Sequence, residues 1–167
     1  VDQDGNDPFV DPDGNSTIVD DDPSAYVAAA NPSIDIEKTT NGFQADDPTG
    51  DQTDVNNTVP YVELGDPVTW QYVITNSGDT ALLVDGFADD QIADVSTLCT
   101  EGTLFPVTVQ PTETLTCTVV DVATAQPGDL YINTADVTGI AVDTDGDPIV
   151  DQDGNDPFVD PDGISTI

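Results

Sequence analysis

Apolar residues recur at every second position along much of the chain between residues 34 and 140. The clearest run covers residues 67–76, where Val68, Trp70, Tyr72 and Ile74 occupy alternate positions. A period of two places successive side chains on opposite faces of a β-strand, so these four are predicted to face the core. Strands are expected at residues 34–39, 68–75, 81–87, 92–98, 104–109, 114–122 and 130–140.

Glycine, proline, asparagine and aspartate separate these runs. Turn signals occur at residues 41–42, 65–67, 76–79 and 126–129. Short strands joined by frequent turns, with no helical period, are typical of a sandwich. The sequence therefore predicts an all-β sandwich of about seven strands. Residues 44–60 are too polar and acidic for a strand and are expected to form a loop.

The C-terminal part follows a different pattern, in which aspartate takes the alternating position. The unit Val-Asp-x-Asp-Gly begins at Val142, Val150 and Val159. Alternating carboxylates on a loop that a glycine turns back on itself can surround a hard, oxygen-preferring cation. We therefore predict several bound calcium ions, and poor binding of magnesium, which requires a stricter octahedron. The candidate ligands are Asp2, Asp4, Asp7, Asp11, Asp13, Asp20, Asp22, Asp143, Asp145, Asp147, Asp151, Asp153, Asp156, Asp160 and Asp162.

This acidic segment occurs twice. Residues 1–18 match residues 150–167 at every position except one, where Asn15 corresponds to Ile164, and the period is therefore 149 residues. Such near-identity indicates a tandem array, of which the chain contains one period and an overlap. The expected organisation is an acidic calcium-binding linker over 1–32, a sandwich over 33–139 and a second acidic linker over 140–167. Any secretion signal is expected outside this stretch.

The charge of the chain limits the kinds of partner that it can bind. It has 34 acidic residues against one base, Lys38, and a formal net charge of -33. Self-repulsion of this size calls for bound divalent cations or for screening in a very salty environment. A halophilic surface module without specific metal sites remains an alternative, although it does not explain the regular Asp-x-Asp-Gly register. Nucleic acid and anionic membranes are poor partners because both require lysine and arginine, and no apolar run approaches a membrane span.

The two cysteines, Cys99 and Cys117, lack the spacing of a zinc or redox pair, and the chain has no histidine. A disulfide is the expected use, with two buried thiols as the alternative. Because disulfides persist in oxidising compartments, an extracellular or cell-surface location is predicted. No enzymatic role is expected, since the aspartates cluster in polar runs rather than in an apolar pocket that would raise a carboxyl pKa.

Five short motifs follow one another between residues 33 and 139. They are Ile-Asp-Ile-Glu-Lys-Thr-Thr-Asn at 34–41, Gly-Asp-Pro-Val-Thr-Trp-Gln-Tyr at 65–72 with Thr-Asn-Ser-Gly at 75–78, Asp-Asp at 89–90, the cysteine strand at 113–118, and Tyr-x-Asn-Thr-Ala-x-Val-Thr-Gly at 131–139. Together they resemble the immunoglobulin-like "conserved repeat" domains found in tandem in large prokaryotic surface proteins. The resemblance implies an immunoglobulin-like β-sandwich that serves as a structural module and spacer, without catalysis. The acidic segment is longer and more regular than the usual linker of such domains.

Lys38 shares a strand face with Ile34 and Ile36, so it is expected to point into the sandwich, where an ammonium must be paired or chemically consumed. Asn133 points inward by the same argument, and the first and last strands of an immunoglobulin-like fold can be neighbours. One hypothesis is a Lys38–Asn133 isopeptide bond promoted by a nearby carboxylic acid, as in some bacterial surface domains. The other is a salt bridge near a strand end, which a flexible lysine stem reaches easily.

Two functions follow from these patterns. The first is a structural repeat of an extracellular filament or stalk, stiffened by calcium and partnered by neighbouring copies of the same repeat or subunit. In it, Phe158 and Val159, with Phe9 and Val10 of the other copy, are expected to dock on the neighbouring sandwich. The second is an adhesive or ligand-binding domain that grips a sugar or another surface through a loop such as residues 44–60. The regular acidic register favours the structural role.

Overall fold

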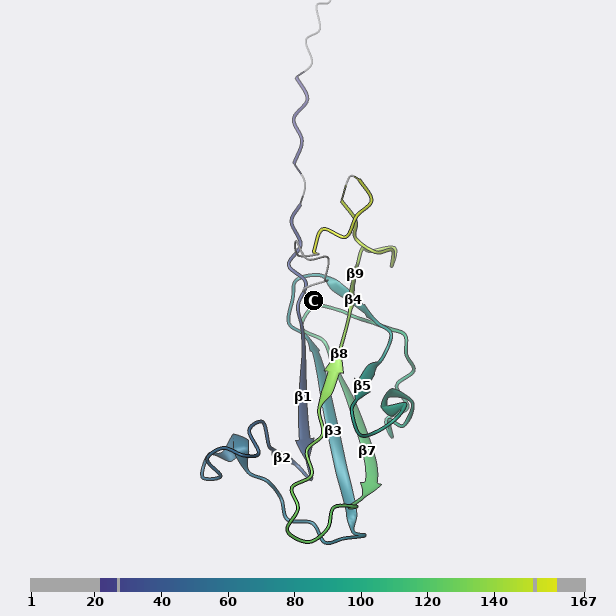
Figure 1. The fold of residues 1–167 in the computed structure, drawn as a ribbon. Helices are drawn as coiled ribbons and strands as arrows, with labels where there is room; N and C mark the ends of the chain where they lie inside the picture. Colours follow the sequence, from purple (N-terminus) through teal and green to yellow (C-terminus); the bar gives the residue numbers. More distant parts are fainter. Residues whose placement is uncertain (1–21, 27, 152, 159–167) are drawn as a thin grey trace, which may run out of the picture.

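The computed structural model describes residues 22–26, 28–151 and 153–158, which form an all-β, sandwich-like fold (Figure 1). The strands are β1 (Ile34–Thr40), β2 (Phe43–Gln44), β3 (Pro67–Asn76), β4 (Ala81–Val84), β5 (Phe87–Asp89), β6 (Val107–Val109), β7 (Thr114–Val122), β8 (Ala135–Val137) and β9 (Ile140–Val142). Two short 3-10 helices, η1 (Val55–Asn57) and η2 (Val95–Thr97), lie in loops. In these described stretches no helix is long and apolar enough to cross a membrane.

The first sheet is antiparallel and has the order β2-β1-β3-β7. Its central strand, β3, carries the clearest alternating run, and Val68, Trp70, Tyr72 and Ile74 are all buried as the pattern predicts. β1 pairs with β3 along its whole length, and β7 pairs with the other edge. The backbone groups of β3 therefore have partners on both sides, which allows this apolar strand to lie in the core.

Two smaller antiparallel sheets, β6-β4-β9 and β5-β8, pack against the first. β4 and β5 are one stretch interrupted at residues 85–86, and β8 and β9 are one stretch interrupted at residues 138–139. Because β4 pairs with β9 and β5 pairs with β8, both stretches break at the same level. Gly86 occupies this break with a φ of 152°, a conformation that favours glycine.

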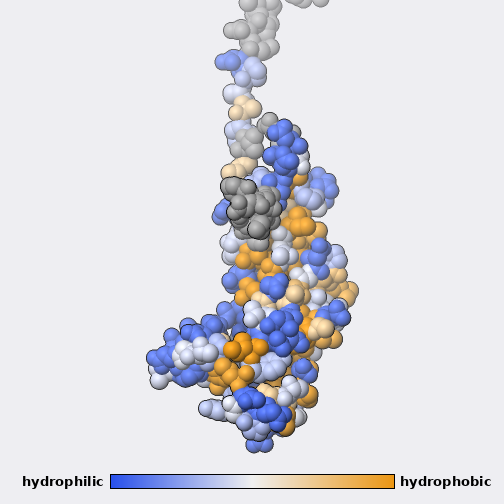
Figure 2. Space-filling model, viewed as in Figure 1, coloured by the Kyte–Doolittle hydropathy of each residue, from blue (hydrophilic) through white to orange (hydrophobic). Residues whose placement is uncertain are grey.

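The core consists of two clusters of buried side chains. The larger includes Trp70 and Tyr72 of β3 with Phe87 of β5, and the Tyr72 and Phe87 ring centroids lie 4.8 Å apart. The second is formed by Leu82 and Val84 of β4 with residues of β6 and β9. Hydrophilic side chains cover the projecting loop that contains η1 and the acidic turns at the other end of the molecule (Figure 2). The sheets therefore bury both clusters between them, with polar side chains at the two ends of the molecule.

Several predicted strands differ from the observed ones. The prediction of a strand at 92–98 is wrong, because this segment forms η2 after Asp94 takes a left-handed φ of 53°. Its apolar residues, Ile92, Val95 and Leu98, recur every third position, which suits a tight helical turn rather than a strand. The strand expected at 104–109 is reduced to β6, and the one expected at 130–140 is reduced to β8 and β9. The short strand β2 is an addition.

The start of β1 and the end of β9 lie at the same end of the sandwich. Ile34 pairs with Asn76 at the end of β3, while Val142 pairs with Ala81, which begins the next strand of the chain. The turn at residues 77–79 also holds residues 31–33 there through backbone hydrogen bonds. Figure 1 shows both connecting segments leaving from this end.

The C-terminal acidic segment folds onto the sandwich of its own chain. The Ile149 backbone N–H donates to the Ala141 carbonyl at 2.9 Å, and Ile149 and Phe158 pack against the second core cluster. Phe158, which was expected to dock on a neighbouring sandwich, packs in this structure against the second core cluster of its own chain. Val159, Phe9 and Val10 lie outside the described residues.

Candidate functional site

A base, a carboxylate and a carboxamide meet inside the sandwich. Lys38 comes from the middle of β1, Asp89 from the end of β5, and Asn133 from the segment that leads into β8. Pairing of β5 with β8 brings Asp89 beside the Asn133 segment, and β8 lies close to β1. The fold therefore joins three side chains that are distant in the sequence.

Each of these three side chains contacts the other two. Lys38 Nζ lies 2.7 Å from Asp89 Oδ2 and also donates a hydrogen bond to Asn133 Oδ1. Asn133 Nδ2 lies 3.3 Å from both carboxylate oxygens of Asp89. We call Lys38, Asp89 and Asn133 the Lys38 cluster.

Neighbouring groups hold the Asp89 carboxylate in place. The Tyr72 hydroxyl donates to Oδ2 at 2.7 Å, and the backbone N–H groups of Gln91 and Ile92 each donate to Oδ1 at 3.0 Å. With the contacts to Lys38 and Asn133, both oxygens have several donors. The carboxylate therefore has one well-defined orientation towards the amine.

The next aspartate positions Asn133. Asp90 Oδ1 accepts from the Thr134 backbone N–H at 2.7 Å, and the Asp90 N–H donates to the Thr134 carbonyl at 3.0 Å. These bonds hold the residue beside Asn133 against the end of β5. Asp89 and Asp90 thus have separate roles, one at the amine and carboxamide and the other at the backbone.

Aromatic rings surround the amine. Lys38 Nζ lies 4.9 Å from the centroid of the Trp70 ring and 5.2 Å from that of Tyr72. The Tyr131 ring packs against Trp70 at 6.1 Å between centroids. The Asp89 side chain is 0% exposed and that of Lys38 is 15% exposed, so the cluster is largely shielded from water. In such surroundings the rings stabilise a cation while offering it no hydrogen-bond acceptor.

The surroundings alter the protonation of these groups. Burial lowers the Lys38 pKa below its ordinary value, although Asp89 and Asp90 act to raise it. Burial acts to raise the Asp89 pKa, but hydrogen bonds from Lys38, Tyr72 and Gln91 outweigh that effect and leave the pKa below its ordinary value. Burial and the Asp89 carboxylate raise the Tyr72 pKa, so its phenol stays a donor. The amine is therefore closer to its neutral, nucleophilic form than an exposed lysine.

The sequence-based hypothesis about Lys38 and Asn133 placed both residues on inward faces, and the structure brings them together. Asp89 was not singled out as their partner. The signal was present, because Asp89 lies two residues after the buried Phe87 and so shares its inward face. Strand parity alone predicts the direction of Asp89 but not the neighbour it meets.

The predicted disulfide is confirmed. Cys99 and Cys117 are bonded, with their Cα atoms 4.8 Å apart and a sequence separation of 18. The bond ties the loop after η2 to the centre of β7. Glu101 reinforces this connection by accepting from the Thr118 backbone N–H at 2.7 Å.

The acidic unit forms the same turn twice in succession. Asp143 Oδ1 accepts from the backbone N–H groups of Asp145 and Asp147 at 2.9 and 3.0 Å. Asp151 Oδ1 accepts from those of Asp153 and Asn155 at 2.9 and 2.8 Å. The glycine of each unit has a positive φ, 88° at Gly146 and 82° at Gly154, which lets the loop close. The first aspartate of each unit therefore stabilises its own turn.

The predicted calcium ligands do not converge within the described residues. In residues 22–26, 28–151 and 153–158, no three acidic or cysteine side chains are grouped so that they could hold a metal ion. Asp22, Asp143, Asp145, Asp147, Asp151, Asp153 and Asp156 belong to this part of the chain and are all exposed. Asp2, Asp4, Asp7, Asp11, Asp13, Asp20, Asp160 and Asp162 lie outside it. The oxygen donors suit calcium in type, but these turns alone do not gather them around one point.

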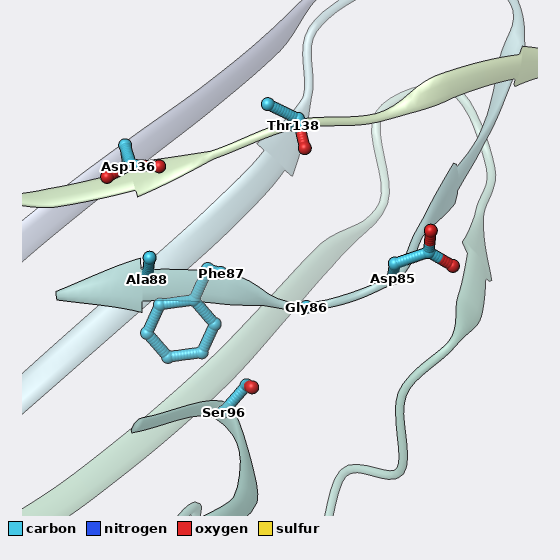
Figure 3. Close-up of a pocket in the computed structure, with 7 residues that line it drawn as sticks. All are labelled: Asp85, Gly86, Phe87, Ala88, Ser96, Asp136 and Thr138. Carbon is cyan, nitrogen blue, oxygen red and sulfur yellow. The ribbon is translucent and has the colours of Figure 1, made fainter. Parts of the chain in front are cut away.

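A shallow depression of about 290 Å³ lies beside the break between β4 and β5 (Figure 3). Its lining consists of Asp85, Gly86, Phe87, Ala88, Ser96, Asp136 and Thr138. The two carboxylates come from different segments and lie apart in Figure 3, with the Phe87 ring and Ser96 on another side. The depression therefore lacks a convergent set of groups for acid–base chemistry.

No protein-family model, curated protein or solved structure matches this chain. The fold, the Lys38 cluster and the internal repeat are the basis on which a function can be proposed.

Proposed function

We propose that this chain is a structural module of a tandem array that forms an extracellular filament or stalk, with neighbouring copies of the module as its partners. The observation that carries the proposal is that the recurring acidic segment continues directly from β9 and packs onto the sandwich through Ile149 and Phe158. A free linker would let each sandwich swing independently. A segment that is packed against its domain restricts that motion.

The same proposal assigns the sandwich to the immunoglobulin-like class and to the "conserved repeat" domains. The strand order β1-β3-β7 supports this assignment, because it corresponds to A-B-E in one sheet of the constant-type immunoglobulin fold. The Cys99–Cys117 bond supports an extracellular location, since disulfides persist where the environment is oxidising.

The positions of the two connections favour a particular shape for the array. Domains with connections at opposite ends stack head to tail. Here Ile34 and Val142 lie at the same end of the sandwich. We therefore expect successive acidic segments to form the line of the filament, with the sandwiches projecting from it.

Calcium bound to the acidic segments would stiffen this line. Their repeated register and the formal net charge of -33 support the proposal, because like charges this dense require neutralisation. Asp143 and Asp151 already hold their own turns, so they are less available than the other aspartates of each unit. Convergence on an ion would require the carboxylates of successive turns to approach one another.

Small-angle scattering on a chain of two consecutive periods tests both parts of the proposal. In calcium we expect a long, narrow particle, and in chelator a broader distribution of distances while circular dichroism shows the same strand content. Magnesium should substitute poorly for calcium. A matched variant with Asp145, Asp147, Asp153 and Asp156 changed to asparagine should keep both turns but lose the response to calcium.

The possible outcomes test the filament and the binding of calcium separately. If the two sandwiches fold back side by side in calcium, the filament is wrong. If the particle stays long but ignores chelator and responds only to molar monovalent salt, the array stands and the halophilic interpretation replaces calcium.

An adhesive role is the second candidate, and the loop between β2 and β3 favours it. This loop projects from the sandwich (Figures 1 and 2), and its Val55 and Tyr61 side chains are 78% and 105% exposed. Exposed apolar side chains on a projecting loop can mark a binding surface. Binding on a glycan array that Tyr61→Ser abolishes, without a change in melting temperature, would support adhesion.

A further inference from the structure

We propose that Lys38 and Asn133 become joined by an intramolecular isopeptide bond that the folded chain forms by itself, with Asp89 as the catalytic carboxyl group. The bond would link β1 to the segment before β8. Its formation depends only on the Lys38 cluster. Its mechanical consequence, considered below, rests on the proposed function as a tandem structural module.

The first argument is proximity. Lys38 Nζ is in hydrogen-bond contact with Asn133 Oδ1, so the amine lies directly against the carboxamide whose carbon it would attack. β1 fixes one reactant and the Asp90–Thr134 pair fixes the segment carrying the other. Holding two reacting groups in this way replaces a bimolecular encounter with an intramolecular one and removes much of the entropic barrier.

The second argument concerns the arrangement of charge. A simple salt bridge between Lys38 and Asp89 requires no carboxamide, and a lysine stem usually carries its ammonium to the surface. Here the ammonium stays among Trp70 and Tyr72, and Asn133 contacts both members of the pair. The third residue is what distinguishes a reactive group of side chains from an ion pair.

The reaction balances without an external reagent. Lys38 transfers a proton to Asp89, and the neutral Nζ attacks Cγ of Asn133, while both carboxyl oxygens of Asp89 lie 3.3 Å from the leaving nitrogen, Nδ2. Asp89 passes its proton to Nδ2, which lets the Cγ–Nδ2 bond break, and the carboxylate so regenerated takes up the second proton that Nζ loses. One Nζ–Cγ amide forms, one ammonia leaves, and no group is oxidised or reduced.

The exclusion of water from the cluster favours the reaction. The largely dehydrated pocket disfavours the ammonium form of Lys38, which promotes proton transfer to Asp89. Tyr72 keeps Asp89 oriented through its 2.7 Å hydrogen bond. Exclusion of water also suppresses hydrolysis of the carboxamide, the competing reaction at the same carbon.

The bond would change how the module responds to tension. With both connections at one end, a pull on Ile34 and Val142 separates β1 from β3 and β9 from β4 one hydrogen bond at a time. A Lys38–Asn133 bond stops that separation at Lys38 and carries the force across the sandwich. Lys38 and Asn133 have a sequence separation of 95, and the residues between them would then bear no load.

Intact mass spectrometry of the whole chain gives the first test. The wild-type chain should weigh one ammonia less than its sequence requires, after the loss of two hydrogens at the disulfide is counted. Lys38→Met, Asn133→Ala and Asp89→Asn should each have the full sequence mass. The Asn41-Gly42 pair can also lose ammonia by forming a cyclic imide. The mass measurement therefore needs a second readout.

Trypsin provides that readout, because the chain contains a single lysine or arginine, Lys38. An acylated lysine is not a trypsin site. The reduced and denatured wild-type chain should therefore remain uncut, while Asn133→Ala should be cut into residues 1–38 and 39–167. Asn56→Ala, at an exposed asparagine in the η1 loop, is the matched control and should remain uncut.

Each outcome decides the proposal. Wild-type chain with full mass that trypsin cuts completely would overturn the bond. Asp89→Asn that cross-links at the wild-type rate would overturn the catalytic role of Asp89. The wild-type measurement needs no variant to fold, and it concerns a single module, so its result is independent of whether the array forms a filament.

Discussion

The Lys38 cluster and the acidic turns at residues 143–156 are both built around aspartate, yet their carboxylates have different roles. The Asp89 side chain is fully buried and contacts a lysine, a tyrosine and an asparagine side chain. Asp143 and Asp151 are exposed and accept hydrogen bonds from the backbone of their own turns. The environment supplied by the fold, rather than the residue type, decides which groups an aspartate contacts.

The physical reason for the difference is dehydration. In the exposed turns, water and salt screen each carboxylate, and proton transfer to a neighbour has no advantage. In the cluster, one carboxylate faces the only base of the chain in a pocket that excludes water. Four predictions test this comparison, in order of decreasing effect.

Asn133→Ala should cause the largest loss of stability. It removes the proposed cross-link, which would close a loop with a sequence separation of 95. For a covalent closure of about 100 residues the chain-entropy model gives about 4.7 kcal/mol. Urea unfolding of the wild type and of Asn133→Ala measures the difference in their free energies of unfolding. Asn155→Ala, the equivalent change in an acidic turn, should cost less than about 0.5 kcal/mol, and equal losses in the two variants would contradict the comparison.

Loss of the disulfide should have the next largest effect. The Cys99–Cys117 bond closes a loop with a sequence separation of 18, for which the same model gives about 3 kcal/mol. Urea unfolding of wild type and of the double variant Cys99→Ala/Cys117→Ala measures it. The double variant should still resist trypsin, because the Lys38 cluster contains no cysteine. Cutting at Lys38 would show that the cluster needs the disulfide for its assembly.

Calcium should stabilise the turns but leave the cluster unaffected. One ion that binds only the folded chain adds about 1.4 kcal/mol when free calcium is ten times the dissociation constant. Calorimetry should show this increase in wild type and in Asp89→Asn. It should be absent when Asp145, Asp147, Asp153 and Asp156 are all changed to asparagine. If Asp89→Asn abolished the calcium-dependent stabilisation instead, calcium would act at the Lys38 cluster rather than at the acidic turns, and the comparison would be wrong.

Acid should produce the smallest effect. The test uses Asn133→Ala, in which the proposed cross-link cannot form and Lys38 and Asp89 remain an ion pair. The Asp89 pKa lies below its ordinary value of 3.8, so its stabilisation is present above that value and is lost as the pH falls through the lower folded pKa. The unfolding free energies of Asn133→Ala and Asn133→Ala/Asp89→Asn should therefore converge on acidification. A constant difference would show that Asp89 is not ionised in the fold.

The local sequence determined the strands in which the alternation is long and one face is mostly apolar. β3 and β7 appeared where predicted, and the inward face of β3 is the predicted one. The inward direction of Lys38 followed from the same parity. The period of the apolar pattern and the face on which each side chain lies are properties of the strand itself. They can therefore be predicted without knowledge of the neighbouring strands.

Tertiary structure decided which elements meet. Residues 95–97 form η2, from which Val95 reaches the core, and Asp89 joined Lys38 because β5 pairs with β8 beside β1. Phe158 covers the second core cluster of its own chain, and both connections leave from one end. These outcomes depend on pairing between segments far apart in the chain, where the gain from burying a shared apolar surface outweighs the preferences of short runs.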